Sequence, residues 1–115
     1  MTKADKAKEL FLKGYNCAQA VFCAFEDVTH VDDKLALRLT SSMGGGVGRL
    51  REICGAVSGA ALVLGVLYGS EDPCNAAEKA AHYARVQEVG EKFRAEAGAI
   101  VCRELLKLQE EKNEP

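Results

Sequence analysis

The stretch CGAVSGAALVLGVLYG, residues 54–69, decides the fold of this chain. It is apolar and rich in small residues, and it carries no charged side chain. A helix needs roughly 20 apolar residues to cross a bilayer, and no basic cluster flanks this shorter stretch to set a topology. We therefore expect a helix from about Leu50 or Arg51 to Tyr68, buried at the centre of a protein outside the membrane.

Amphipathic segments surround the central stretch, with apolar residues at helical spacing. Start and stop signals at Asn16, at Asp32 or Asp33, at Asp72-Pro73 and at Gly98 divide them. The expected helices are Lys3–Lys13, Cys17 to Phe25 or Asp27, Asp32 or Asp33 to Met43, Pro73 to about Glu96, and Ala99–Glu111.

No segment alternates polar and apolar residues for long, so no sheet is expected. The predicted fold is all-α, a compact bundle of about five to six helices around the central Gly/Ala-rich helix. Residues 1–115 form a single domain, with residues 112–115 frayed. Leu35, Leu39 and Met43 recur at every fourth position, which predicts one inward helix face.

Composition limits the classes of function. The formal charge of −2 is spread over the chain, which argues against a nucleic-acid partner. Residues 1–10 lack the apolar core of a secretory signal, so a cytoplasmic location is expected. The cysteine count of 5 is odd and their spacing irregular, unlike a secreted disulfide framework. Such cysteines serve as metal ligands, redox thiols or core residues.

The cysteines gather at predicted helix starts, where free backbone N–H groups and the helix dipole stabilise a thiolate. This holds for Cys54, Cys17, Cys102 and Cys74, whereas Cys23 is assigned a packing role. Gly55 and Gly59 share one face of the central helix, which indicates close approach of a neighbouring helix. That approach either serves tight packing alone or brings a second thiol, best Cys17, to Cys54.

The glycine run at residues 44–48 is a second candidate site. Gly45 and Gly46, with Arg49 after them, are the residues expected to bind an anion or anionic cofactor. The run is neither a dinucleotide-binding fingerprint nor a P-loop. The alternative is a close turn between packed helices, and we favour it.

Four motifs in order complete the pattern: GYNCAQAV from Gly14, GGGVGR from Gly44, CGAVSG from Cys54 and CRELL from Cys102. Together they resemble the redox-active protein family labelled C_GCAxxG_C_C, over about residues 5–108. The resemblance implies a redox role. Cys17, Cys54 and Cys102 match three of that family's four cysteines. The fourth has no counterpart within these 115 residues, so Cys74 or Cys23 would have to replace it.

The leading hypothesis is a small thiol-redox protein, an oxidoreductase if it is an enzyme, that acts on an unidentified redox partner protein. Cys54 would be the nucleophile, Cys17 the resolving thiol and Cys102 a third participant. The alternative is an iron–sulfur or other metal site with Cys17, Cys54, Cys74 and Cys102 as ligands. A third hypothesis is a helical interaction module that forms a homodimer and whose cysteines only pack.

Overall fold

The computed structural model describes residues 1–113, which form helices joined by turns and contain no strand. This confirms the all-α prediction. The elements are α1 (Lys3–Leu12), α2 (Cys17–Ala24), α3 (Glu26–Thr29), α4 (Asp33–Thr40), the 3₁₀ turn η1 (Ser41–Met43), α5 (Gly55–Tyr68), α6 (Ala76–Ala97) and α7 (Cys102–Asn113). The fraying expected at residues 112–115 stays a prediction: α7 ends at Asn113, and 114–115 lie outside the described residues.

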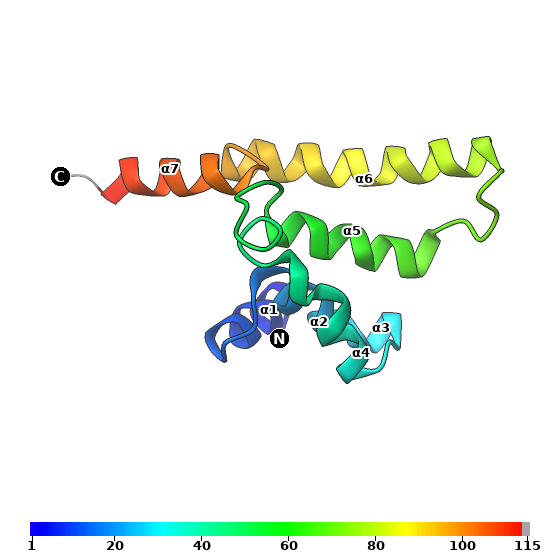
Figure 1. The fold of residues 1–115 in the computed structure, drawn as a ribbon, viewed down its shortest axis with the longest axis horizontal. Helices are drawn as coiled ribbons and strands as arrows, with labels where there is room; N and C mark the ends of the chain where they lie inside the picture. The colour runs from blue at the N-terminus through cyan, green and yellow to red at the C-terminus, as the bar shows by residue number, and fades with distance from the viewer. Residues whose placement is uncertain (114–115) are drawn as a thin grey trace.

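The central position of the apolar stretch is confirmed. Figure 1 shows α5 between the long helix α6 and the group formed by α1 to α4. Helix α7 projects past the end of α6, away from the other helices (Figure 1). None of the helices in the described part of the chain is long and apolar enough to span a membrane.

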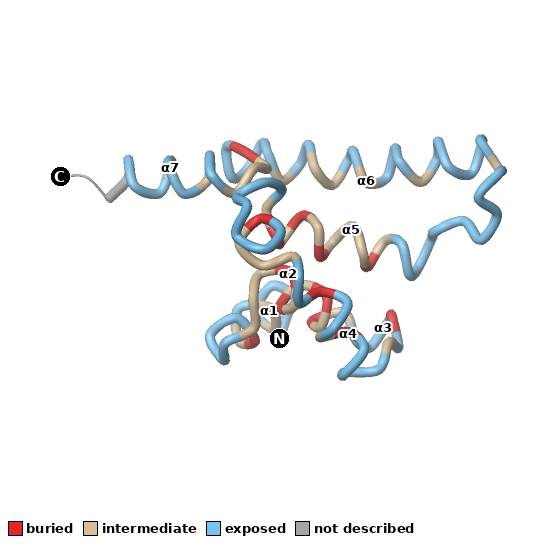
Figure 2. The backbone as a smooth tube through the Cα atoms, in the orientation of Figure 1, coloured by how far each residue is buried: buried red, intermediate tan, exposed pale blue. Residues whose placement is uncertain are grey.

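The core is small and lies on one side of α5. Phe22 of α2, Ala36 of α4 and Val63 of α5 form its centre, and Cys23 packs against them. The packing role predicted for Cys23 is confirmed. Figure 2 shows the buried residues concentrated on α2 and along α5, whereas α6 has none. The last turn of α5 is exposed, including Tyr68.

Helices α2 and α5 are joined by glycine contacts. A Cβ at Gly55 would lie 2.8 Å from the backbone nitrogen of Ala18, and one at Gly59 would lie 2.8 Å from its carbonyl oxygen. Real Cβ atoms do not come this close, because packed interiors leave no free space. The close approach predicted from the spacing of these glycines is confirmed, and it holds the start of α5 against the start of α2.

Polar caps fix most helix starts. Asn16 accepts a hydrogen bond from the Gln19 amide at 2.8 Å, and Asp32 accepts one from the Leu35 amide at 3.2 Å. Both caps were predicted. The predicted start of α6 at Asp72-Pro73 is wrong, because Asn75 is the residue that caps it, accepting from the Glu78 amide at 3.0 Å. Asp72 instead accepts from the Cys74 amide within the preceding turn.

The predicted inward face of α4 is wrong. Leu35 is 42 % exposed and Leu39 47 % exposed, whereas Ala36 and Thr40 are buried. The helix is only 8 residues long, and its small residues face α2. The buried Thr40 hydroxyl is satisfied by donating to the Ala36 carbonyl at 2.7 Å. The spacing of Leu35 and Leu39 correctly placed them on one face of the helix. It did not show whether that face lies against the core or in solvent.

The predicted starts of α5 and α7 are also wrong. Helix α5 begins at Gly55 instead of Leu50 or Arg51, and α7 begins at Cys102 instead of Ala99. The residues in between are used for a different purpose: Ile53 pairs with Val101 in an isolated antiparallel bridge. Backbone pairing between these distant segments replaces a helical turn at each position.

Candidate functional site

Three cysteines meet where three helices begin. Cys17 is the first residue of α2, Cys54 is the N-cap of α5, and Cys102 is the first residue of α7. All three are half-buried, free thiols. These are the three residues that the sequence assigned to redox chemistry, and the fold brings them together from across the chain.

The bridge between Ile53 and Val101 sets the relation of Cys54 to Cys102. The Cys54 amide donates to the Ile100 carbonyl at 2.8 Å, and the Cys102 amide donates to the Glu52 carbonyl at 2.5 Å. Alternate residues of an antiparallel pair share a face, so Cys54 and Cys102 occupy diagonal positions on either side of the bridge. The bridge therefore brings the start of α7 beside the start of α5.

Cys17 reaches the cluster from α2. A Cβ at Gly55 would lie 2.9 Å from the Cβ of Cys17. Gly55 follows Cys54 directly, and consecutive Cα atoms are about 3.8 Å apart. Any side chain at position 55 would therefore push Cys17 away from Cys54, and the glycine allows the two thiols to be neighbours.

The cluster changes the acidity of Cys17. Burial raises the pKa of the Cys17 thiol, and the neighbouring Cys54 and Cys102 raise that pKa further when they carry negative charge. Like charges that are close together cannot all ionise easily. Cys17 therefore holds its proton more firmly than an ordinary cysteine does.

Cys54 occupies a position that other helices give to a polar cap. Thr2, Asn16, Asp32 and Asn75 each accept a hydrogen bond from a backbone amide of their helix. Cys54 makes no side-chain cap bond. The first amides of a helix have no acceptor within it, so a sulfur at this position lies beside backbone donors that an anion satisfies better than a thiol.

Arginine side chains surround Cys102. The Nη1 of Arg51 lies 3.7 Å from the Cys102 Sγ, as a donor to the sulfur. Arg103 pairs with Glu52 at 2.5 Å, which ties the start of α7 to the segment before Cys54. Sequence reasoning missed the Arg51–Cys102 contact, because 51 residues separate the partners and no local pattern shows it.

The glycine run forms a left-handed turn that packs on the cluster. Gly45, Gly46, Val47, Gly48 and Arg49 all have positive φ, a conformation that costs residues other than glycine about 1–2 kcal/mol each. A Cβ at Gly46 would lie 2.7 Å from the Cys102 Cβ. The predicted close turn is present, and it closes over Cys102.

The same turn lies against the start of α2. A Cβ at Gly44 would lie 2.9 Å from the side chain of Asn16, the residue before Cys17. The side-chain amide of Asn16 also donates to the carbonyls of Thr40 and Ser41, each at 3.4 Å. Asn16 therefore caps α2 and holds η1 beside the thiols at the same time.

Comparison with known proteins assigns the chain to a family. The family model described as "Putative redox-active protein (C_GCAxxG_C_C)" matches residues 15–115. The chain belongs to this family. No curated protein and no solved structure matches it. The match includes all three cysteines of the cluster and the glycine turn that covers them.

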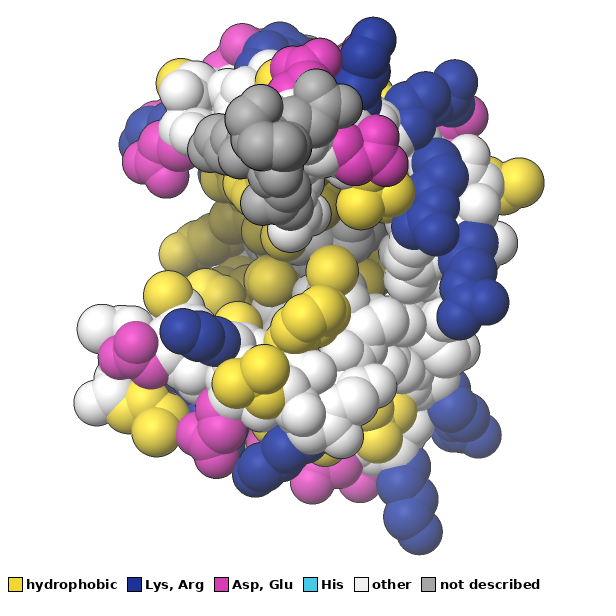
Figure 3. Space-filling view, turned by 90° about the vertical axis from the view of Figure 1, so that its left-hand side faces the viewer, with side chains coloured by type: hydrophobic (Ala, Val, Ile, Leu, Met, Phe, Trp, Pro, Cys, Tyr) yellow, Lys and Arg dark blue, Asp and Glu magenta, His cyan; other side chains and the backbone are white. Residues whose placement is uncertain are grey.

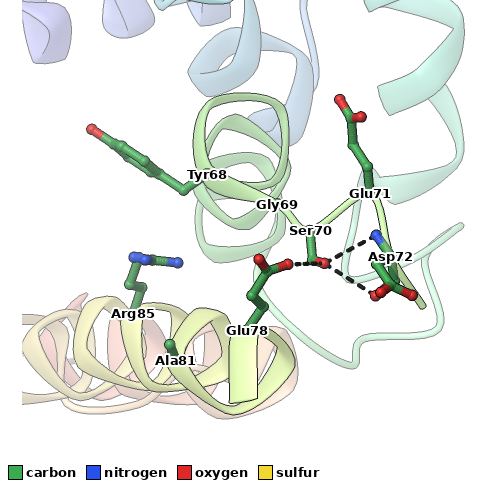
Figure 4. A pocket seen from close by; sticks show the side chains of 8 residues that line it. All are labelled: Tyr68, Gly69, Ser70, Glu71, Asp72, Glu78, Ala81 and Arg85. Carbon is green, nitrogen blue, oxygen red and sulfur yellow. Dashed lines mark hydrogen bonds between the residues drawn. The ribbon is translucent and has the colours of Figure 1, made fainter. Parts of the chain in front are cut away.

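Cys74, the remaining cysteine predicted as a ligand in this family member, lies far from the cluster. It is exposed in the loop after α5, whereas Cys54 precedes α5. That helix has 14 residues and is about 21 Å long at 1.5 Å per residue, so its two ends are far apart. Figure 4 shows the pocket at this distant end, where Arg85 lies over Tyr68 and Ser70 donates to Glu78 at 2.6 Å. No cysteine lines that pocket.

The residues of the cluster do not form a ready-made metal site. Within residues 1–113, no group of three or more His, Cys, Asp and Glu is placed to hold a metal ion. An iron–sulfur cluster usually takes four cysteines, and the distant Cys74 cannot join the other three in this arrangement. The iron–sulfur hypothesis stays a prediction, and no chemical step below depends on a metal.

The raised pKa of Cys17 predicts that stability falls in mild alkali. The unfolded thiol ionises near pH 8.5–9, whereas the folded one does so only at higher pH. The unfolded state therefore loses the proton first, and the free energy of unfolding decreases as pH rises through this interval. Urea unfolding at pH 7.5 and pH 9.5 measures the loss. We expect Cys17→Ala to reduce the loss and Cys74→Ala to leave it unchanged, and an equal loss in all proteins would contradict the assignment.

Proposed function

We propose that Cys17, Cys54 and Cys102 form a redox centre that exchanges two electrons with the disulfide of a partner. The convergence of three thiols at three helix starts carries the proposal. Buried Ala18 and Val57 lie beside the cluster, but their packing does not require a thiol at the start of each of three helices. Membership of a family described as redox-active supports the same role.

The exchange balances without any group beyond the two proteins. The thiolate of Cys54 attacks one sulfur of the partner's disulfide, the S–S bond breaks, and one partner thiolate leaves with the bonding electrons. Cys17 then loses its proton and attacks the Cys54 sulfur of the mixed disulfide, which releases the second partner thiolate. The partner gains two electrons and two protons, and this chain is left with a Cys17–Cys54 disulfide.

The surroundings of each thiol support these roles. Cys54 is the N-cap of α5, at the helix end where the first backbone amides lack intrahelical acceptors. Cys17 is the protonated neighbour, because its pKa is raised, and it lies beside the residue that follows Cys54. Cys102 has Arg51 as a donor to its sulfur, and it is a second thiol that can attack the mixed disulfide.

Disulfide mapping of the unmodified protein tests the proposal. The reduced protein is mixed with one equivalent of hydroxyethyl disulfide, free thiols are trapped with iodoacetamide, and peptides are identified by mass spectrometry. We expect a Cys17–Cys54 bond as the main product, with Cys102 and Cys23 alkylated. A product in which the cluster thiols are all alkylated, or in which only Cys74 has reacted, would overturn the proposal.

An iron–sulfur centre is a second candidate, and one observation favours it. Cys54 and Cys102 lie near enough to Cys17 for their charges to raise its pKa, so three of the four cysteines that a cluster usually takes are neighbours. The missing ligand would have to come from outside this cluster. Iron and sulfide content after purification without oxygen decides the matter. Stoichiometric iron that is lost in Cys17→Ser and Cys102→Ser but kept in Cys74→Ser would support it, and metal-free protein would remove it.

A further inference from the structure

We propose that the pocket beside Cys17 binds the anionic group of a small disulfide substrate, with Arg49 as the cation that selects it. This inference rests on the proposed function and names the chemical class of its substrate. The class is a disulfide that carries carboxylates close to its sulfur atoms.

The pocket lies at the glycine turn that packs on the thiol cluster, although no cysteine lines it. It has a volume of about 420 Å³ and is lined by Asn16, Ser41, Gly44, Gly45, Gly48 and Arg49. Asn16 is bonded to Cys17, so a molecule held here lies next to the start of α2 and its thiol. The larger pocket beside Tyr68 is lined by Glu71, Asp72 and Glu78, which repel an anion, and it has no thiol nearby.

The lining of the pocket offers donors and no negative charge. No Asp or Glu contributes to it. In the part of the chain that the structure describes, the amides of Gly44, Gly45 and Gly48 have no acceptor, whereas those of Val47 and Arg49 are bonded within the turn. Successive amides in such turns form concave anion sites. Backbone donors, the Asn16 amide and the Ser41 hydroxyl suit a carboxylate.

Arg49 is positioned by the turn and left without a partner. A Cβ at Gly45 would lie 2.8 Å from the Cγ of Arg49, so the arginine stem folds over the glycine that lines the pocket. The ion pairs of residues 1–113 include Arg94 and Arg103 but not Arg49. Its guanidinium is therefore free to bind a carboxylate, and a fixed fork of donors matches that group.

Nearby charges reinforce the preference. Arg51 lies against Cys102, and Glu52, the carboxylate next to it, is neutralised by Arg103. Figure 3 shows several Lys and Arg side chains along one edge of the molecule, separate from the hydrophobic recess beside it. A cationic disulfide is repelled by the same groups that attract an anionic one.

The test compares three small disulfides of different charge. Reduced protein is mixed with dithiodiglycolate, hydroxyethyl disulfide or cystamine, which carry negative, no and positive charge. Each rate of intrachain disulfide formation is divided by the rate of that disulfide with a neutral model thiol, which removes intrinsic reactivity. We expect the largest ratio for dithiodiglycolate, and Arg49→Gln to lower that ratio about five- to tenfold while leaving hydroxyethyl disulfide unchanged.

Arg85→Gln is the matched control, because it makes the same change of charge at the opposite end of α5 (Figure 4). It should leave the dithiodiglycolate ratio within about twofold of the unmodified protein. Equal ratios for the three disulfides, a preference for cystamine, or equal losses in Arg49→Gln and Arg85→Gln would overturn the inference while leaving the proposed function intact. If no disulfide oxidises the cluster, the proposed function itself fails.

Discussion

Replacement of Cys54 by serine is expected to slow oxidation of the cluster by hydroxyethyl disulfide at least about tenfold at pH 7. A serine hydroxyl does not attack a disulfide, so the reaction falls to the two remaining thiols. Burial raises the pKa of Cys17, which leaves it with less thiolate than a free cysteine at this pH. Release of partner thiol, followed by absorbance, gives the rate.

The comparison is made in a Cys74→Ser background, because the exposed Cys74 reacts by itself and would obscure the difference. Cys74→Ser alone should retain the fast release of thiol from hydroxyethyl disulfide. The double variant Cys54→Ser, Cys74→Ser should lose this fast release and should no longer release two thiols per protein. Equal rates for the single and double variants would show that Cys54 is not the attacking thiol.

Gly59→Ala is expected to lower the free energy of unfolding by about 1–3 kcal/mol. The new methyl group would lie 2.8 Å from the carbonyl oxygen of Ala18 and 3.2 Å from the Cβ of Val21. Backbone atoms cannot move aside without separating α2 from α5. The loss exceeds the gain of about 1 kcal/mol that alanine brings to a helix interior. Urea unfolding followed by circular dichroism measures it.

Gly65→Ala is the control in the same helix. Nothing lies within 4 Å of a Cβ at this position, so only the helix preference of alanine acts, and stability should rise by up to about 1 kcal/mol. Opposite signs for the two variants are the expected result. Two changes of the same sign would show that the glycine contact with Ala18 does not hold α2 and α5 together.

Much of this architecture could be predicted from local patterns. Asn16 and Asp32 are recognisable caps because capping involves residues only three positions apart. The close approach of α2 to α5 could be predicted from Gly55 and Gly59, since glycine inside a helix is costly and needs a reason. That reasoning also identified Cys17 as the neighbour of Cys54, and the structure places it there.

The features that could not be predicted from the sequence depend on contacts between distant segments. The Ile53–Val101 bridge joins residues 48 apart, and it replaces the first turn expected of α5 and of α7. The positions of Arg51 against Cys102 and of Gly46 against Cys102 follow from that bridge. Pro73, the residue before Cys74, is of a type that normally opens a helix, but Asn75 is the residue that caps α6. The sequence is compatible with a start of α6 at either place.

Helix α7 projects from the rest of the protein (Figure 1). The three sulfurs of the cluster are therefore not held in place equally firmly. Cys17 and Cys54 are separated only if α2 leaves α5, which requires loss of the core. Cys102 is tied to Cys54 through the hydrogen bonds of one bridge and the exposed Arg103–Glu52 ion pair, and openings of this kind cost less than global unfolding. The centre is thus a fixed pair with a detachable third sulfur, and amide hydrogen exchange at Cys102 should outpace that at the buried Phe22 within α2.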